Sequence, residues 1–393
     1  MRATPGWLLL LVLLTSACAP RLAPIGAGGQ PFTPAEDEWG LWAEADKESA
    51  VLLQRVRAHD DPMVKKYLTL MLERLVPEEA SGPGGPVWRA EVLRDPTLNV
   101  LALPDGQVIV HTGLLAALES EAQLALLLAR AVAQITHRHA LRALRAGRIA
   151  PAVHDGVAAL SPAAAAMLGQ RLPAAATACL TGYGEPLERQ ADAVAVAALV
   201  GAGWDPEEAT TVWNLLAGEA RGPLEVFLLG RPEWLRERRD STRRALEPVI
   251  SSGGARTSEE FEIVLRPVVR DNAVEDMRAG RFTLARRALD RVLAAAPTDP
   301  LAHLYDGDLH RLQSQRAGAP DEREASMRGA EARYARAIAL DPALAEPHRQ
   351  LGLLHYQRGD VARARAELEQ YLALAPGAPD AARVAEYVQE LGR

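Results

Sequence analysis

Apolar residues recur at helical spacing through residues 121–146, and this pattern predicts a long, mostly buried helix. The stretch begins EAQLALLLARAVAQITHRH, in which Ala and Leu predominate. Arg130 and Gln134 are four residues apart and therefore share one face of the helix. His137 continues that face, whereas His139 lies about 200° around the helix from it, so these two imidazoles do not converge on one metal ion. The periodicity alone is equally typical of an ordinary buried helix.

A different pattern begins near Arg266, where the chain becomes a series of helical pairs that end in Pro. Residues 343–376 read ALAEPHRQLGLLHYQRGDVARARAELEQYLALAP and resemble a tetratricopeptide repeat. This unit ends at Pro376 and the preceding one at Pro342, which gives the 34-residue period of that repeat. An earlier unit ends at Pro297, and the longer interval after it contains a polar insertion. We expect two clear repeats, one degenerate repeat and a C-terminal capping helix.

The composition narrows the class of protein. With 393 residues, the chain is long enough for two domains with sizeable cores. It is rich in Ala, Leu and Arg and poor in Phe and Tyr, which fits a mostly helical protein. The net charge is −7 and no stripe of basic residues is present, which argues against nucleic acid as a partner.

The first residues have the pattern of a secretory signal. Arg2 supplies positive charge, and residues 7–14 form an apolar run that is too short to span a bilayer. The sequence LTSAC, ending at Cys18, resembles a bacterial lipobox, so we expect a signal peptide at 1–17 and a lipid-anchored flexible linker at 18–35. Cleavage of an ordinary signal peptide nearby is the alternative. Ala after the cysteine, rather than Asp, favours the outer membrane by resemblance to lipoprotein sorting.

The predicted helix at 121–139 resembles the active-site helix of HtpX-like and BepA-like zinc metallopeptidases, metallopeptidase family 48, which reads E-x-E-L-A-x-V-L-x-H-E-I-x-H-V-x-x-R-H. In register, Arg130 replaces the first ligand His, Ala131 replaces the catalytic Glu and Gln134 replaces the second ligand His. A guanidinium cannot donate a lone pair, an amide is a poor zinc ligand and a methyl group moves no proton. The resemblance therefore implies a peptidase fold in which Arg130-Ala131-Val132-Ala133-Gln134 stands in place of H-E-x-x-H.

Two further segments carry the same resemblance. Residues 98–115, LNVLALPDGQVIVHTGLL, resemble the family's edge strand and following turn. Residues 187–206, LERQADAVAVAALVGAGWDP, resemble its second zinc helix, which places Glu188 at the third ligand position and Asp192 at that of a carboxylate just outside the ligands. His139 matches the family's R-H pair and is expected to support the site. With zinc absent, we expect the guanidinium of the first helix to pair with Glu188.

These observations predict a mainly α protein. By resemblance, residues 36–265 form a zincin-like α+β peptidase domain with a small β-sheet, and residues 266–393 form an α-helical tetratricopeptide repeat domain. A repeat tail behind a peptidase domain is itself the BepA-like layout.

The functional prediction is an envelope lipoprotein that has lost catalysis. We expect a periplasm-facing pseudopeptidase, attached to the outer membrane, that binds peptides or proteins through its repeats in protein quality control or assembly. No catalytic residue, metal or other cofactor is expected. Two alternatives remain open: an active zinc metalloendopeptidase that uses other ligands, and a scaffold of tetratricopeptide repeats whose cleft is closed.

Overall fold

The computed structural model describes residues 22–28, 31–55, 58–146, 183–219, 229–247 and 253–392. The predicted signal peptide, Cys18 and the start of the predicted linker lie outside the described residues. In the part that is described, no helix is long and apolar enough to cross a bilayer.

A small mixed sheet stands at the centre of the N-terminal body. Its three strands are β1 (Arg89–Leu93), β2 (Val100–Ala102) and β3 (Gln107–His111), in the order β1-β3-β2. Strand β3 runs parallel to β1 and antiparallel to β2, and it is buried along its whole length. Both of its faces must therefore be covered by helices.

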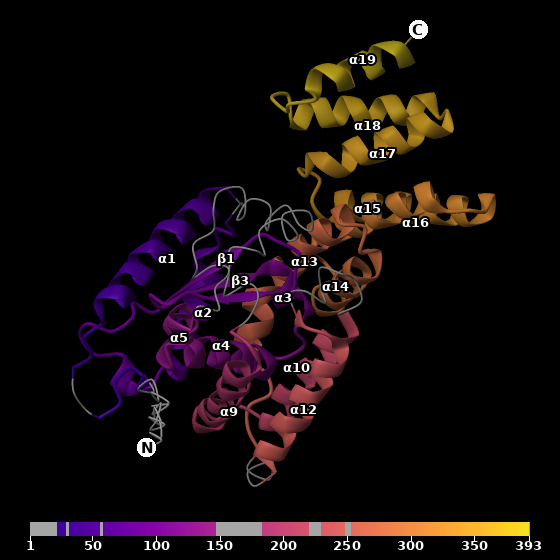
Figure 1. Cartoon of the computed structure of the whole chain (residues 1–393). Helices are drawn as coiled ribbons and strands as arrows, with labels where there is room; N and C mark the ends of the chain where they lie inside the picture. Colours follow the sequence, from indigo (N-terminus) through magenta and orange to yellow (C-terminus); the bar gives the residue numbers. More distant parts are fainter. Residues whose placement is uncertain are drawn as a thin grey trace, which may run out of the picture.

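Alternate residues of β3 point to opposite faces of the sheet and pack in two different hydrophobic clusters. Val108 and Val110 face a large cluster that includes α2 (Pro62–Leu75) and α4 (Glu121–Thr136). Ile109 faces the other way, toward a second cluster with α1 (Glu36–Arg55). Figure 1 shows this layering, with α1 on one side of the sheet and α2 and α4 on the other. The predicted small sheet within a mainly α protein is confirmed.

The remaining described elements of the body complete these two layers. They are η1 (Glu78–Ala80), α3 (Thr112–Ala117), α5 (His139–Arg145), α9 (Glu185–Gly201), α10 (Pro206–Glu219) and α12 (Pro232–Leu246). Helix α4 packs on α9, α10, α2 and β2, so it is the central helix of the body.

The helix expected over 121–146 is interrupted. Helix α4 ends at Thr136, and Arg138 adopts a left-handed conformation with φ of 57° before α5 begins. Arg138 is held there by Glu38, a buried carboxylate of α1, with Arg138 Nε 2.8 Å from Glu38 Oε1. The Arg138 guanidinium also lies over the ring of Phe32. This tertiary pairing, rather than a glycine, makes the left-handed turn.

The C-terminal part consists of paired helices. They are α13 (Glu259–Arg278), α14 (Phe282–Ala295), α15 (Pro300–Arg316), α16 (Pro320–Leu340), α17 (Ala345–Arg358), α18 (Val361–Leu374) and α19 (Ala381–Leu391). Gly352 packs so closely on Leu368 that an added Cβ would lie 2.7 Å from its Cδ2 atom. This agrees with the repeat pattern expected from the sequence. The polar insertion lengthens α15 and α16 instead of forming a loop.

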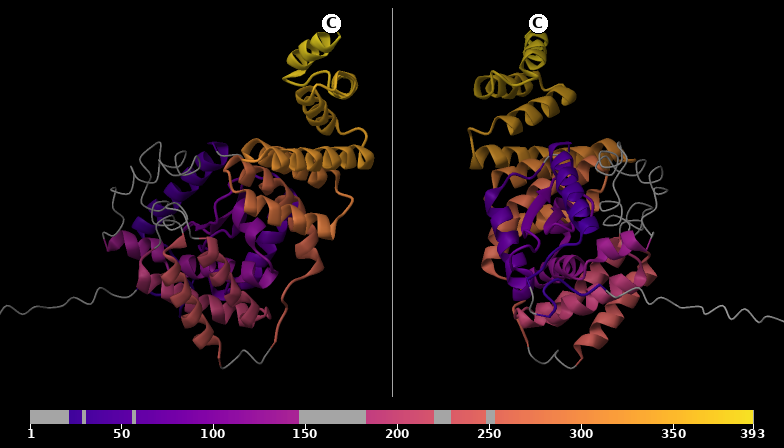
Figure 2. Two further views of the ribbon diagram at one scale, coloured as in Figure 1. Left: turned by 90° about the vertical axis from the view of Figure 1, so that its right-hand side faces the viewer. Right: turned by 60° about the vertical axis from the view of Figure 1, so that its left-hand side comes forward.

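One helix belongs to both parts of the molecule. Phe261 and Val268 of α13 lie in the core of the body, whereas Val269 and Met277 lie in the core of the first repeat helices. The boundary expected between residues 265 and 266 thus falls inside a continuous helix. Helices α13 and α14 pack on the body, and α15 and α16 stack on them, while α17, α18 and α19 project away, as Figures 1 and 2 show.

Hydrogen bonds also join the body to the first repeat helices. Thr112 Oγ1 lies 2.8 Å from Asn272 Oδ1. Arg281 donates to the Pro96 carbonyl, and Arg291 Nη1 donates to the Leu118 carbonyl at 2.6 Å. The first repeat helices are therefore part of the folded body.

Truncations at two positions test this organisation. A chain ending after residue 342 should keep the melting temperature of the body within about 4 °C, because it loses only the projecting helices. A chain ending after residue 267 should lower it by more than about 10 °C or prevent folding, because it cuts α13 between the two cores. Thermal circular dichroism distinguishes the two results. An undisturbed melt of the chain that ends after residue 267 would show that the body ends before α13 does.

Candidate functional site

Two packed helices, α4 and α9, bring the predicted site residues together. Ser120 caps the start of α4 through a hydrogen bond from Gln123 N–H to its hydroxyl. Most of the following residues of α4 are apolar and buried in the core, whereas Arg130 and Gln134 face α9. Glu188 and Asp192 are four residues apart on α9 and point toward α4. The site is thus built from two i, i+4 pairs on facing helices.

Arg130 lies between the two carboxylates. Its Nη2 atom contacts Glu188 Oε2, and its Nε atom is 2.5 Å from Asp192 Oδ1. Glu188 Oε1 also accepts hydrogen bonds from Gln134 Nε2 at 3.3 Å and from the Tyr183 N–H at 3.1 Å. The side chains of Arg130, Glu188 and Asp192 are 14%, 13% and 10% exposed. The pairing of Arg130 with Glu188, expected from the sequence, is present, and Asp192 joins it.

A second arginine, Arg238 of α12, completes the cluster. Its Nε and Nη2 atoms lie 2.8 and 2.6 Å from the two oxygens of Asp192, which is a bidentate contact. The ring of Trp213 lies beneath both guanidinium groups, 4.0 Å from Arg238 Cζ and 5.4 Å from Arg130 Cζ. Two cations and two carboxylates therefore form one largely buried, charge-balanced network.

Arg238 was not predicted as a site residue, although the sequence carries a weak signal for it. It lies in the basic run RERRDSTRR, which is typical of a solvent-exposed helix face. On α12, however, Arg238 falls at helical spacing between Leu235 and Leu246, and these residues are all buried. An arginine within an apolar stripe is the sign of a buried ion pair.

The charges of this network shift the pKa values of Asp192, Arg130 and Arg238. Burial raises the pKa of Asp192, but the charges of Arg238 and Arg130 outweigh this and hold it below its usual value of 3.8. Burial lowers the pKa of Arg130, yet Asp192 and Glu188 bring it above the usual value. For Arg238, burial and the charge of Arg130 prevail, and the pKa is lowered. The carboxylate stays ionised at neutral pH, as required for pairing.

The histidines stand apart from this network. His139 Nε2 lies 3.2 Å from Gln190 Oε1, and its ring packs edge-on against Tyr183. Burial lowers the pKa of His139 to about 4, so the ring is neutral at pH 7. On the far side of the sheet, His111 Nδ1 is 2.6 Å from Thr97 Oγ1. His139 thus lies beside the site without contacting its carboxylates.

The donor set does not fit a zinc ion. Both carboxylates that point between α4 and α9 are already bonded to guanidinium groups. The facing residues of α4 offer a guanidinium and an amide, neither of which is a zinc ligand of ordinary proteins. Within the described ranges, no group of three or more His, Cys, Asp or Glu side chains is arranged to hold a metal. The hollow that borders Asp192 and Arg238 has a volume of about 30 Å³.

Comparison with known families explains this geometry. The sequence model of peptidase family M48 matches residues 62–261, which is more than half of the chain and includes α4 and α9. The chain belongs to peptidase family M48. A tetratricopeptide repeat model matches residues 322–389. The family and the mainly α fold with C-terminal repeats, as expected from the sequence, are confirmed.

Several curated proteins are similar over part of their length. The beta-barrel assembly-enhancing protease of Escherichia coli K12 is 26% identical over 280 residues, which cover 61% of this chain and 56% of that protein. The protein of the same name from Yersinia pestis is 26% identical over 226 residues, covering 50% and 45%. The mitochondrial metalloendopeptidase OMA1 of Schizosaccharomyces pombe is 28% identical over 149 residues, covering 38% and 42%. The chain thus matches about half the length of these relatives.

Among solved structures, a thermophilic tetratricopeptide-repeat protein of Thermus thermophilus is 19% identical, with a TM-score of 0.27, and covers 40% of this chain and 75% of that protein.

Substitution of Arg130 tests the network in the M48 domain. Arg130→Ala should lower the free energy of unfolding by about 3 kcal/mol, because Glu188 then remains largely buried without its cation. The double variant Arg130→Ala/Glu188→Gln should recover much of this loss. Urea unfolding of the full chain measures both values, and the double-mutant cycle gives the coupling.

Arg189→Ala is the matched control, because Arg189 is next to Glu188 on α9 but pairs with Glu185 and Glu237 at the surface. We expect its unfolding curve to overlay that of the unchanged chain. A double variant no more stable than Arg130→Ala would contradict the pairing.

Proposed function

We propose that this chain is a non-catalytic M48 protein, a pseudopeptidase that binds peptides or proteins without cleaving them. The observation that carries this proposal is the Arg130 guanidinium bonded to Glu188, the position at which the family resemblance puts the third zinc ligand. A guanidinium and a zinc ion are both cations, so they compete for the same carboxylate. In this chain the carboxylate is held by the permanent cation.

The missing proton acceptor supports the same proposal. Metal-assisted peptide hydrolysis needs a base beside the metal-bound water. Ala131 stands where the family resemblance puts that base, and its side chain is buried against the core. No H-E-x-x-H motif occurs anywhere in the sequence. Loss of the ligands and of the base together removes each part of the reaction.

The C-terminal helices support a binding role. Tetratricopeptide repeats stack into extended surfaces that commonly hold other proteins, and α17, α18 and α19 project from the body where a partner can reach them. Relatives that match this chain are named beta-barrel assembly-enhancing proteases. These names support a proposed role for the clients in envelope protein quality control or assembly. The LTSAC pattern that ends at Cys18 supports a proposed lipid anchor in the outer membrane.

Metal analysis tests the loss of catalysis. The purified chain should contain well below one zinc ion per molecule and should leave unfolded casein intact, because the ligand and base positions are substituted. Inductively coupled plasma mass spectrometry and a gel assay give these two readouts. About one zinc per chain, or proteolysis that a chelator stops, would support the active metalloendopeptidase instead.

Restoring the motif gives the converse prediction. The triple variant Arg130→His/Ala131→Glu/Gln134→His should bind about one zinc ion per chain, with Glu188 as the third protein ligand. Adding Glu188→Ala to the triple variant should abolish that binding and serves as the control. Failure of the folded triple variant to bind zinc would show that the assigned register is wrong.

The anchor has its own test. Cys18→Ser should abolish incorporation of radiolabelled palmitate and shift the chain out of the outer-membrane fraction. Cys179→Ser changes the chain's other cysteine and should leave both properties unchanged. Membrane partitioning that survives Cys18→Ser would assign attachment to a bound partner.

A further inference from the structure

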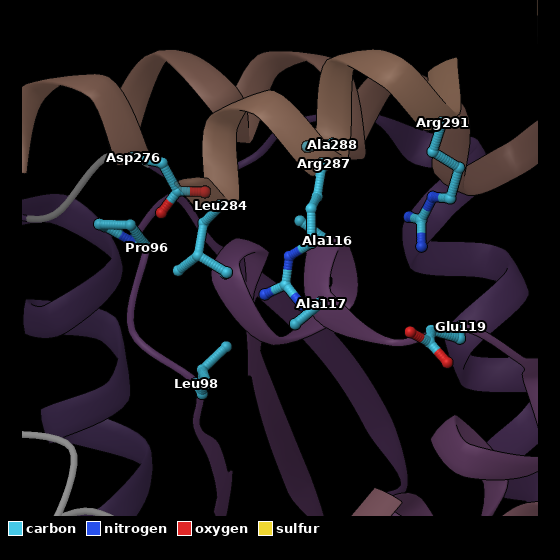
Figure 3. Close-up of a pocket in the computed structure, with 11 residues that line it drawn as sticks. Pro96, Leu98, Ala116, Ala117, Glu119, Asp276, Leu284, Arg287, Ala288 and Arg291 are labelled. Atoms are coloured by element: carbon cyan, nitrogen blue, oxygen red, sulfur yellow. The ribbon is translucent and has the colours of Figure 1, made fainter. Parts of the chain in front are cut away.

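A pocket of about 120 Å³ lies at the junction of the body and the first repeat helices. Figure 3 shows its walls, which are the loop after β1, helix α3 and helix α14. Its apolar lining is formed by Pro96, Leu98, Ala116, Ala117, Leu284 and Ala288. An apolar cavity of about 150 Å³ holds benzene, so this pocket has room for one aliphatic side chain. It is separate from the network between α4 and α9.

Two arginines of α14 line the same pocket. Arg287 and Arg291 are four residues apart and share a face of the helix. Their side chains descend from α14 toward α3, as Figure 3 shows. The Arg287 side chain is 57% exposed and its Nη2 atom contacts Glu219 of α10. Arg287 therefore lies at the solvent-exposed edge of the pocket, where its guanidinium can leave Glu219 and bind another anion.

Arg291 is the more informative of the two. Burial lowers its pKa, and the charges of Glu262 and Glu119 only partly offset the effect. Among the residues that the structure describes, no carboxylate lies within 4.0 Å of its guanidinium, which donates to the Leu118 carbonyl. A half-buried cation without a contacting anion gains stability when a ligand supplies one.

We propose that this pocket binds the C-terminal end of a peptide whose last residue is aliphatic. The terminal carboxylate lies against Arg287 and Arg291, and the last side chain fills the apolar pocket. The two arginines of the lining complement a carboxylate, and its apolar residues complement an adjacent aliphatic group.

An exposed acidic residue of the pocket favours a peptide over a small free acid. Glu119 is exposed at one end of the pocket, whereas Asp276 at the other end is buried and already bonded to Arg281 and Asn272. Backbone N–H groups of a peptide can donate to the Glu119 carboxylate, whereas a short ionised carboxylic acid has no donors. The space between the walls, including the part open to solvent, is about 580 Å³, so the preceding residues of a peptide have room to leave the pocket.

Matched peptide pools test the inference on the full chain. N-terminally fluorescein-labelled hexapeptides ending in Leu should bind at least tenfold more tightly as free acids than as amides, measured by fluorescence anisotropy. Pools ending in Asp should bind as weakly as the amides. Arg287→Glu should reduce binding of the free-acid pool at least tenfold, and Arg291→Lys should also weaken it. Arg278→Ala alters an exposed arginine on α13 outside the pocket and should have no effect.

Several results of this experiment would overturn the proposed site. Equal binding of acids and amides, no binding of any pool, or no effect of Arg287→Glu would overturn the carboxylate site. Displacement of the peptide by isovalerate at equal concentration would assign the pocket to small acids, which also overturns the inference. The inference deepens the proposed function but fails separately from it. A chain that captures unfolded proteins and ignores their C-terminal carboxylates would still be a non-catalytic binding protein.

Discussion

A guanidinium between two carboxylates determines how the central helices of this protein pack. Arg130 holds Glu188 and Asp192 across the interface of α4 and α9, and taking any one of these charges out of water unpaired would cost several kcal/mol. Arg238 and the ring of Trp213 then join α12 and α10 to the same point. Four helices thus meet at one charge-balanced network, and the apolar contacts around it fix the rest of the body.

Much of this arrangement can be predicted from the sequence, because spacing and charge constrain it. Arg130 and Gln134 share a face by their separation of four residues, and the resemblance to the second zinc helix identifies Glu188 as the partner. Arg238 could not be predicted in the same way. Its basic surroundings are typical of an exposed face, and only the tertiary contact with Asp192 distinguishes it from neighbouring arginines.

Other features depend on long-range contacts that leave no local signal. The break at Arg138 involves neither Gly nor Pro, since Glu38, far away in the sequence, holds the left-handed turn. The shared helix α13 is another example. The change of pattern near residue 266 predicts where repeat-like sequence begins, but the helix continues through that point because each of its halves has a different core to cover.

The network also bears on how such a chain evolves. Replacing Arg130 by His alone would leave Glu188 without its cation and would still provide too few ligands for zinc. Stability is therefore lost before any metal affinity is gained. Under the proposed function, the path from this network to a zinc site therefore passes through a less stable intermediate, and single substitutions are selected against along it. Substitutions that change what the repeat helices bind leave the network intact, so they meet no such barrier.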